Sequence, residues 1–149
     1  MTSERHAIIV GAGLGGLAAA VGLRVSGWRV SVLERAPKLA PVGTGISIYP
    51  QALRALRTIG LGAELDALEY GLVAHGIKSP GGEWLTRVDG EEAAELWRGP
   101  ITGFHRADIA ELLLGHLPSD SLHLGATVDA VEGAADGTLD VVTEDGRRF

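Results

Sequence analysis

A glycine-rich turn directly after a short apolar run constrains the fold of this chain more than any other feature. The run AIIV, at residues 7–10, is continuous and apolar, as in strands of parallel sheets that are buried on both faces. Gly11, Gly13 and Gly16 follow at once in the spacing G-x-G-x-x-G. The motif carries information only between a strand and a helix, so the next segment decides its meaning.

The residues after the glycines predict a helix and a second strand. Apolar residues recur at helical spacing from Leu14 to Val25, and Gly27 stands where a helix end favours a positive φ. Residues 29–33, with Val30, Val32 and Leu33, predict a second buried strand that ends at Glu34. Together the segments predict a β-α-β unit, and therefore an α/β fold with a parallel sheet of the Rossmann-like type.

This context gives each glycine a chemical role in binding a dinucleotide. The first allows a tight turn, the second lets the backbone approach a pyrophosphate, and the third lets the helix pack closely on the strand. The N–H groups and the dipole at the helix start then face the phosphates. The predicted binding residues of this turn are Gly11, Gly13, Leu14, Gly15 and Gly16. The alternative is a glycine turn with a purely structural role.

Glu34 supports the dinucleotide interpretation. It follows the first glycine by 23 residues, at the end of the second predicted strand, where a carboxylate accepts hydrogen bonds from ribose hydroxyls. A 2′-phosphate would be repelled there, which favours FAD or NAD over NADP. The adjacent Arg35 softens that preference.

Composition excludes several classes of function. The net charge of −6 disfavours nucleic acid or an anionic membrane surface as partner, because phosphate binding requires clustered Lys and Arg. With no cysteine, the chain has no disulfide or thiolate chemistry, as expected of a cytoplasmic protein. The five histidines are scattered, so no metal site is predicted. Glycines interrupt the apolar N-terminal segment too often for it to span a membrane. Abundant Ala, Gly, Leu and Arg suggest a bacterial source.

The rest of the chain continues the α/β pattern. Residues 37–45 form a predicted loop, and Pro50 begins a helix that Gly60 closes. The remaining elements expected are a short helix at 63–68, a β-hairpin at 72–88 around Ser79-Pro80-Gly81-Gly82, a helix at 106–117, a third parallel strand at 122–124, and a hairpin of 127–131 with 139–143 that turns near Ala135-Asp136-Gly137.

Three segments resemble the flavin-dependent aromatic hydroxylases, the class A monooxygenases related to p-hydroxybenzoate hydroxylase. The first is GAGLGGLAAAVGLRVSGWRVSVLERA, residues 11–36, which many FAD enzymes share. The second is GTGISIYPQALRALRTIGL, residues 43–61, and the third is HRADIAELLLGHL, residues 105–117. The last two are more specific to this family, although Gln51 replaces the usual Asn.

The resemblance implies cofactor contacts at particular residues. Glu34 would bind the adenosine ribose of FAD, and Arg35 would lie near the adenosine or pyrophosphate. Gly45 and Ile46 would pass close to the isoalloxazine ring, and Arg106 would reach FAD from the start of its helix. Without the resemblance, Arg106 would be interpreted as a solvated arginine. No catalytic residue is predicted.

The resemblance also implies that residues 1–149 are the N-terminal part of a larger FAD-binding monooxygenase. Residues 1–70 and 101–149 would form the nucleotide-binding portion, and 71–100 would supply strands of an incomplete substrate domain. The family's Ala-Asp-Gly turn, which follows an apolar strand after the second hairpin, and its still later Gly-Asp segment are expected beyond residue 149. An exposed sheet edge would then be covered by a second copy or by a complementary chain.

The implied activity is NAD(P)H-dependent hydroxylation of an aromatic or polyketide-like small molecule, which the chain is not expected to perform alone. A non-catalytic nucleotide-binding module, or one half of a split enzyme, is the alternative. Other FAD families, such as reductases or amine oxidases, share GAGLGG but not the second and third segments.

Overall fold

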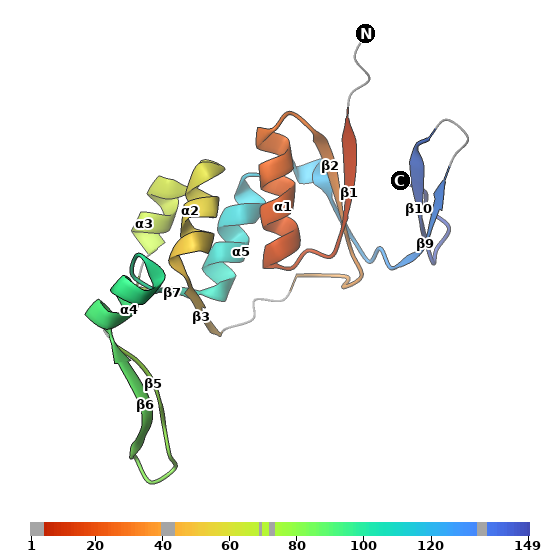
Figure 1. Cartoon of the computed structure of the whole chain (residues 1–149). Helices are drawn as coiled ribbons and strands as arrows, with labels where there is room; N and C mark the ends of the chain where they lie inside the picture. Colours follow the sequence, from red (N-terminus) through yellow and green to blue (C-terminus); the bar gives the residue numbers. More distant parts are fainter. Residues whose placement is uncertain (1–4, 40–43, 69, 72–73, 134–136) are drawn as a thin grey trace. The chain divides into compact units, whose positions relative to one another are not determined.

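The chain forms two compact units (Figure 1). The computed structural model describes residues 5–39, 44–68, 70–71, 74–133 and 137–149. The first unit combines residues 1–41 with 110–149, and the second comprises residues 42–109. Residues 42–70 therefore belong to the same unit as residues 71–100. The assignment of residues 71–100 to a substrate domain stays a prediction.

A parallel three-stranded sheet forms the centre of the first unit. Its strands are β1 (His6–Val10), β2 (Arg29–Glu34) and β8 (Leu122–Leu124), in the order β1-β2-β8. His6 lies opposite Arg29 in the first pair, and Val32 lies opposite Leu122 in the second. The three predicted parallel strands and the predicted α/β class are thus confirmed.

Helix α1 (Leu14–Val25) packs against β1 and β2, as the glycine spacing predicted. Its buried residues Leu17, Ala20 and Val21 share one face because they are separated by three and four positions. After the helix ends, Gly27 adopts a φ of 82° and lets the chain reverse into β2.

Burial differs between the two strands that flank α1 in sequence. In β2, the residues from Val30 to Leu33 are all buried. In β1, four residues are half-buried and Val10 is 62% exposed, so the prediction that this strand is buried on both faces was wrong. The reason is its position: in the described residues, β1 pairs with β2 alone and forms an edge of the sheet.

An antiparallel hairpin, β9 (Val128–Gly133) with β10 (Leu139–Thr143), completes the first unit. It packs on the sheet through a cluster of Leu33, Ala126 and Val141, which Ile8, Val128 and Phe149 extend. Figure 1 shows this hairpin and α1 on opposite sides of β1 and β2. The strands of the hairpin match the prediction, whereas Ala135 and Asp136 of its expected turn lie outside the described residues.

The second unit is built around a small antiparallel sheet. Strand β7 (Thr102–His105) lies between β3 (Gly45–Ile48) and β4 (Tyr70–Gly71). Helices α2 (Pro50–Thr58) and α3 (Gly62–Leu68) follow β3 and contact each other. Among the described residues of this unit, the buried apolar side chains include Ile48, Leu53, Leu61, Leu65, Ile101, Phe104 and Ile109.

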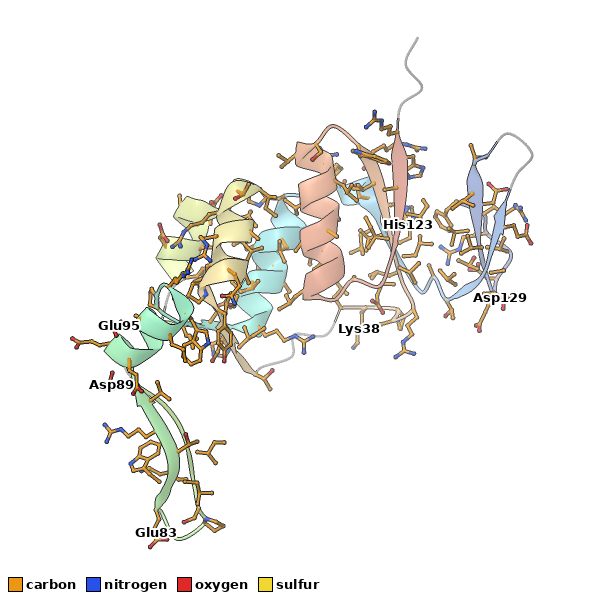
Figure 2. All side chains as sticks on the ribbon, viewed as in Figure 1. Lys38, Glu83, Asp89, Glu95, His123 and Asp129 are labelled. Carbon is orange, nitrogen blue, oxygen red and sulfur yellow. The ribbon has the colours of Figure 1, made fainter. Side chains whose placement is uncertain are left out.

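A hairpin and helix α4 (Gly90–Trp97) complete the second unit, and helix α5 (Arg106–Gly115) begins in this unit and continues into the first. Strands β5 (Ala74–Lys78) and β6 (Trp84–Asp89) form the predicted hairpin, and Figure 2 shows Glu83 at its turn. Helix α4 begins where the Asp89 side chain accepts a hydrogen bond from the amide of Glu92, 2.8 Å away. Helix α5 starts directly after β7, and a single 3₁₀ turn, η1 (Ser119–Ser121), precedes β8.

In the described residues, no helix has both the length and the apolar surface needed to cross a membrane.

Candidate dinucleotide-binding site

The loop between β1 and α1 turns sharply at its first glycine. Gly11 has a φ of +100°, a conformation that L-residues with side chains rarely adopt. Its amide donates a hydrogen bond to the carbonyl of Leu33, 2.7 Å away, which ties the start of the loop to the end of β2. Glycine is therefore required here by the backbone itself.

Gly16 is required by the close approach of α1 to the loop. A Cβ added at this position would overlap the carbonyl oxygen of Gly11 and lie 3.2 Å from its carbonyl carbon. It would also come within 3.4 Å of the Ile9 side chain. The predicted packing role of the third glycine agrees with this geometry.

Gly13 and Gly15 are not required by the folded chain. A Cβ added at either position would meet nothing within 4 Å. Gly13 has a φ of −70° and a ψ of 169°, which any residue can adopt. Both glycines are exposed, so they leave bare backbone beside an open space at the start of α1. A pyrophosphate fits this arrangement, because side chains at these positions would occupy the space it needs.

The N-terminus of α1 is also suited to an anion. Gly13 is the N-cap residue and provides no side-chain hydrogen bond, and the first turn contains no acidic residue. No side chain of α1 therefore places a negative charge beside the N–H groups of its first turn, where the positive end of the helix dipole lies. Such an end binds phosphate groups.

Glu34 lies at the end of β2 and contacts the glycine loop directly. Its Oε2 accepts a hydrogen bond from the amide of Ala12 at 2.8 Å, and its Oε1 accepts one from the amide of Ala36 at 2.9 Å. These bonds, with a smaller contribution from Arg35, hold the pKa of the carboxyl below its ordinary value of 4.5 against the opposing effect of burial. Glu34 is therefore ionised at neutral pH.

The bonds from Glu34 to two backbone amides were not predicted from the sequence. A carboxylate has about four lone-pair positions, so both oxygens retain capacity for ribose hydroxyls. The position of Glu34 at a strand end was visible in the sequence, but the direction of its carboxylate depends on the path of the loop.

Two cationic side chains follow Glu34. Arg35 and Lys38 are both exposed, and Figure 2 shows Lys38 in the segment after β2. Within the described part of the chain, neither side chain forms an ion pair. They leave positive charge available beside the Glu34 carboxylate.

The second unit brings its three predicted flavin-contacting residues close together. Gly45 pairs with His105 and Ile46 pairs with Phe104 across β3 and β7, and Arg106 follows directly. The amide of Arg106 donates to the carbonyl of Thr44 at 3.0 Å, and its side chain is exposed. Residues some sixty positions apart in sequence are thus neighbours within this unit.

Gly45 has a property in common with Gly13. A Cβ at Gly45 would meet only the carbonyl oxygen of Phe104, at 3.8 Å, which is an ordinary contact. The fold of the second unit therefore tolerates a side chain there, and the bare backbone is consistent with close approach of a ligand. Among the described residues, no group of three His, Asp or Glu is arranged to hold a metal ion.

Comparison with known proteins identifies the family. Residues 4–136 match the family model described as FAD binding domain. Aurachin C monooxygenase/isomerase of Stigmatella aurantiaca is 34% identical over 142 residues, covering 95% of this chain and 37% of that protein. The 3-amino-4-hydroxybenzoate 2-monooxygenase of Streptomyces cremeus is 36% identical over 132 residues, covering 86% and 33% respectively.

A solved structure supports the same conclusion. Klebsiella pneumoniae HpxO, complexed with FAD and uric acid, superimposes with a TM-score of 0.80 at 27% identity, covering 97% of this chain and 36% of that one. The chain thus spans about a third of the length of the relatives it matches. The predicted resemblance and the predicted cofactor, FAD, are confirmed. The chain belongs to the FAD binding domain family of the class A flavoprotein hydroxylases.

Proposed function

We propose that this chain supplies the ADP-binding part of the FAD site in a flavoprotein monooxygenase that hydroxylates an aromatic small molecule, with NAD(P)H as reductant. The observation that carries the proposal is the pair of exposed glycines, Gly13 and Gly15, which the fold does not require and which leave open space at an uncapped helix start. The names of the relatives, which act on aminohydroxybenzoate and urate among others, support the aromatic class of substrate.

The residues of the first unit have distinct roles in this proposal. The loop Gly11–Gly16, with the amides at the start of α1 near Leu14, binds the pyrophosphate. Glu34 accepts hydrogen bonds from the ribose hydroxyls, and Arg35 lies near the adenosine. The protein binds and orients the cofactor, while FAD supplies the redox chemistry when bound.

The residues of the second unit are proposed to contact the flavin. The bare backbone of Gly45 and Ile46 would allow close approach of a ring, and the exposed Arg106 would supply positive charge and hydrogen-bond donors. The support is their proximity within the second unit and the resemblance to the hydroxylases.

Activity is proposed to require more polypeptide than the 149 residues described. The chain spans about a third of its relatives, and β1 is an edge strand rich in β-branched residues. Such an edge favours pairing with another strand. A second copy or a complementary polypeptide is therefore proposed to cover it, and no NAD(P)H-dependent turnover is expected from this chain alone.

Two measurements test the proposal. The visible absorption spectrum of the purified chain reports bound flavin, and titration with FAD should show saturable binding. Gly13→Val is the matched variant, because a Cβ at this position meets no atom within 4 Å, so folding should survive while binding is lost. Absence of saturable binding by the folded wild-type chain would refute the proposal.

A further inference from the structure

The Glu34 side chain joins two backbone segments that the sequence separates. Its two oxygens accept hydrogen bonds from Ala12, in the glycine loop, and from Ala36, after β2. Ala12 is buried and lies between the two glycines that begin the loop. The carboxylate therefore fixes the backbone at the point where the chain turns from β1 towards α1.

The neighbouring backbone bonds make this connection rigid at both ends. The carbonyl of Leu33 accepts from Gly11 at 2.7 Å, so the first two amides of the loop are both held by the end of β2. On the other side, the amide of Gly125 donates to the carbonyl of Ala36 at 3.0 Å. The amide of Ala126 donates to the carbonyl of Glu34 itself at 2.8 Å. The carboxylate is thus attached to a backbone that is fixed by other bonds.

Both bonds join Glu34 to backbone amides of this chain, so they are distinct from any hydrogen bond that the carboxylate accepts from a ribose hydroxyl. We propose that Glu34 is a positioning residue, whose carboxylate holds the glycine loop so that Gly13 and the start of α1 are arranged for a pyrophosphate. The identity of the ligand rests on the proposed function, whereas the setting of the loop does not. Glu34 thereby acts on a part of the ligand remote from the ribose.

Protonation of Glu34 weakens this arrangement. Protonation places a hydrogen on one of the two carboxyl oxygens. That O–H then faces the N–H of a backbone amide, so two donors oppose each other and the hydrogen bond is weakened. Arg35 is the charged side chain that contributes to the ionised state of Glu34, and its effect is smaller than that of the two amides. Because either oxygen can carry the proton, we expect the hydrogen bonds to Ala12 and to Ala36 both to weaken as the carboxyl becomes protonated.

The first experiment follows the backbone directly in the ligand-free chain. In ¹⁵N-labelled protein, the amide protons of Ala12 and Ala36 should shift together with the titration of the Glu34 carboxyl, at a pH below 4.5. In Glu34→Gln this common titration should disappear, and in Asp129→Asn, which removes an exposed carboxylate on β9, it should remain. An Ala12 amide that does not follow Glu34 would overturn the proposal.

The second experiment uses a ligand without ribose hydroxyls. Binding of ADP and of 2′,3′-dideoxyadenosine diphosphate is measured for the wild type and for Glu34→Gln. A positioning role predicts that the variant weakens both ligands, with a loss of about tenfold for the dideoxy ligand from one charge-assisted hydrogen bond. A variant that weakens ADP but leaves the dideoxy ligand unchanged would show that Glu34 contacts ribose only. If the wild type binds neither ligand, the proposed function fails, and the amide titration still decides the role of Glu34.

Discussion

Alanine substitutions at Gly15 and Gly16, two adjacent glycines of α1, are expected to change stability in opposite directions. At Gly15 a methyl group enters empty space, and replacing glycine by alanine within a helix stabilises it by roughly 0.5–1 kcal/mol. At Gly16 the methyl group would overlap the carbonyl oxygen of Gly11. Overpacking of this kind costs about 1–3 kcal/mol. The difference between the two variants should therefore exceed about 1.5 kcal/mol in the free energy of unfolding.

FAD affinity separates the variants in a second way. Gly15→Ala should weaken FAD binding although it stabilises the protein, because the methyl group takes the space proposed for the pyrophosphate. Gly16→Ala should weaken binding through distortion of the loop and should lower stability at the same time. Urea denaturation of the ligand-free chains gives the first quantity, and titration with FAD gives the second.

The outcome that refutes the reasoning is specific. If Gly15→Ala destabilises the ligand-free chain as much as Gly16→Ala does, then the space beside Gly15 is not open. If Gly15→Ala stabilises the chain and binds FAD as tightly as the wild type, the space is open but is not where the cofactor binds.

Three further predictions concern other parts of the molecule. Because the pKa of Glu34 is lowered in the folded protein, its contribution to stability should be present above about pH 4.5 and should be lost as the pH falls through the folded pKa. The difference in unfolding free energy between the wild type and Glu34→Gln should therefore shrink on acidification. A difference independent of pH would contradict this. Gly76→Ala should disrupt hairpin β5–β6, because its Cβ would overlap the Trp84 ring, and Trp84 fluorescence should change; unchanged fluorescence would contradict the packing. Leu33→Ala should cost about 2–5 kcal/mol in urea denaturation, whereas Leu139→Ala, at a residue 65% exposed, should have little effect; equal losses would contradict the assigned core.

The β-α-β unit could be predicted because its signals are local. The apolar run before Gly11, the helical spacing up to Val25 and the run that ends at Glu34 each identify one element without knowledge of the others. The strand at 122–124 also followed from its apolar residues and its place after a helix. The elements could therefore be assigned before their pairing was known.

The second unit was less accessible from sequence because its pairing is non-local. Residues 45–48 were not assigned as a strand, since GISI follows a glycine-rich loop and is only four residues long. They become a strand by pairing with β7, more than fifty residues later, which was also not predicted. Glu91, Glu92 and Glu95 alone indicate either a charged helix turn or a loop, and the Asp89 cap shows why residues 90–97 form a helix.

The candidate site shows the same division. The sequence identified Gly11, Gly13 and Glu34 as a group, because a known spacing links them. It did not show that Glu34 bonds to the amide of Ala12, since such a bond depends on side-chain direction. Nor could it show that the amide of Arg106 donates a hydrogen bond to the carbonyl of Thr44, because this contact requires β3 and β7 to pair.

The central claim, that the glycine loop and Glu34 bind the ADP part of FAD, is tested most directly by titrating the ¹⁵N-labelled chain with FAD. The account predicts that the largest amide shift changes in the first unit occur at residues 11–16 and 34–36, with little change at Gly137 or Gly146 in the hairpin region. Saturable FAD binding that leaves residues 11–16 unchanged would contradict it.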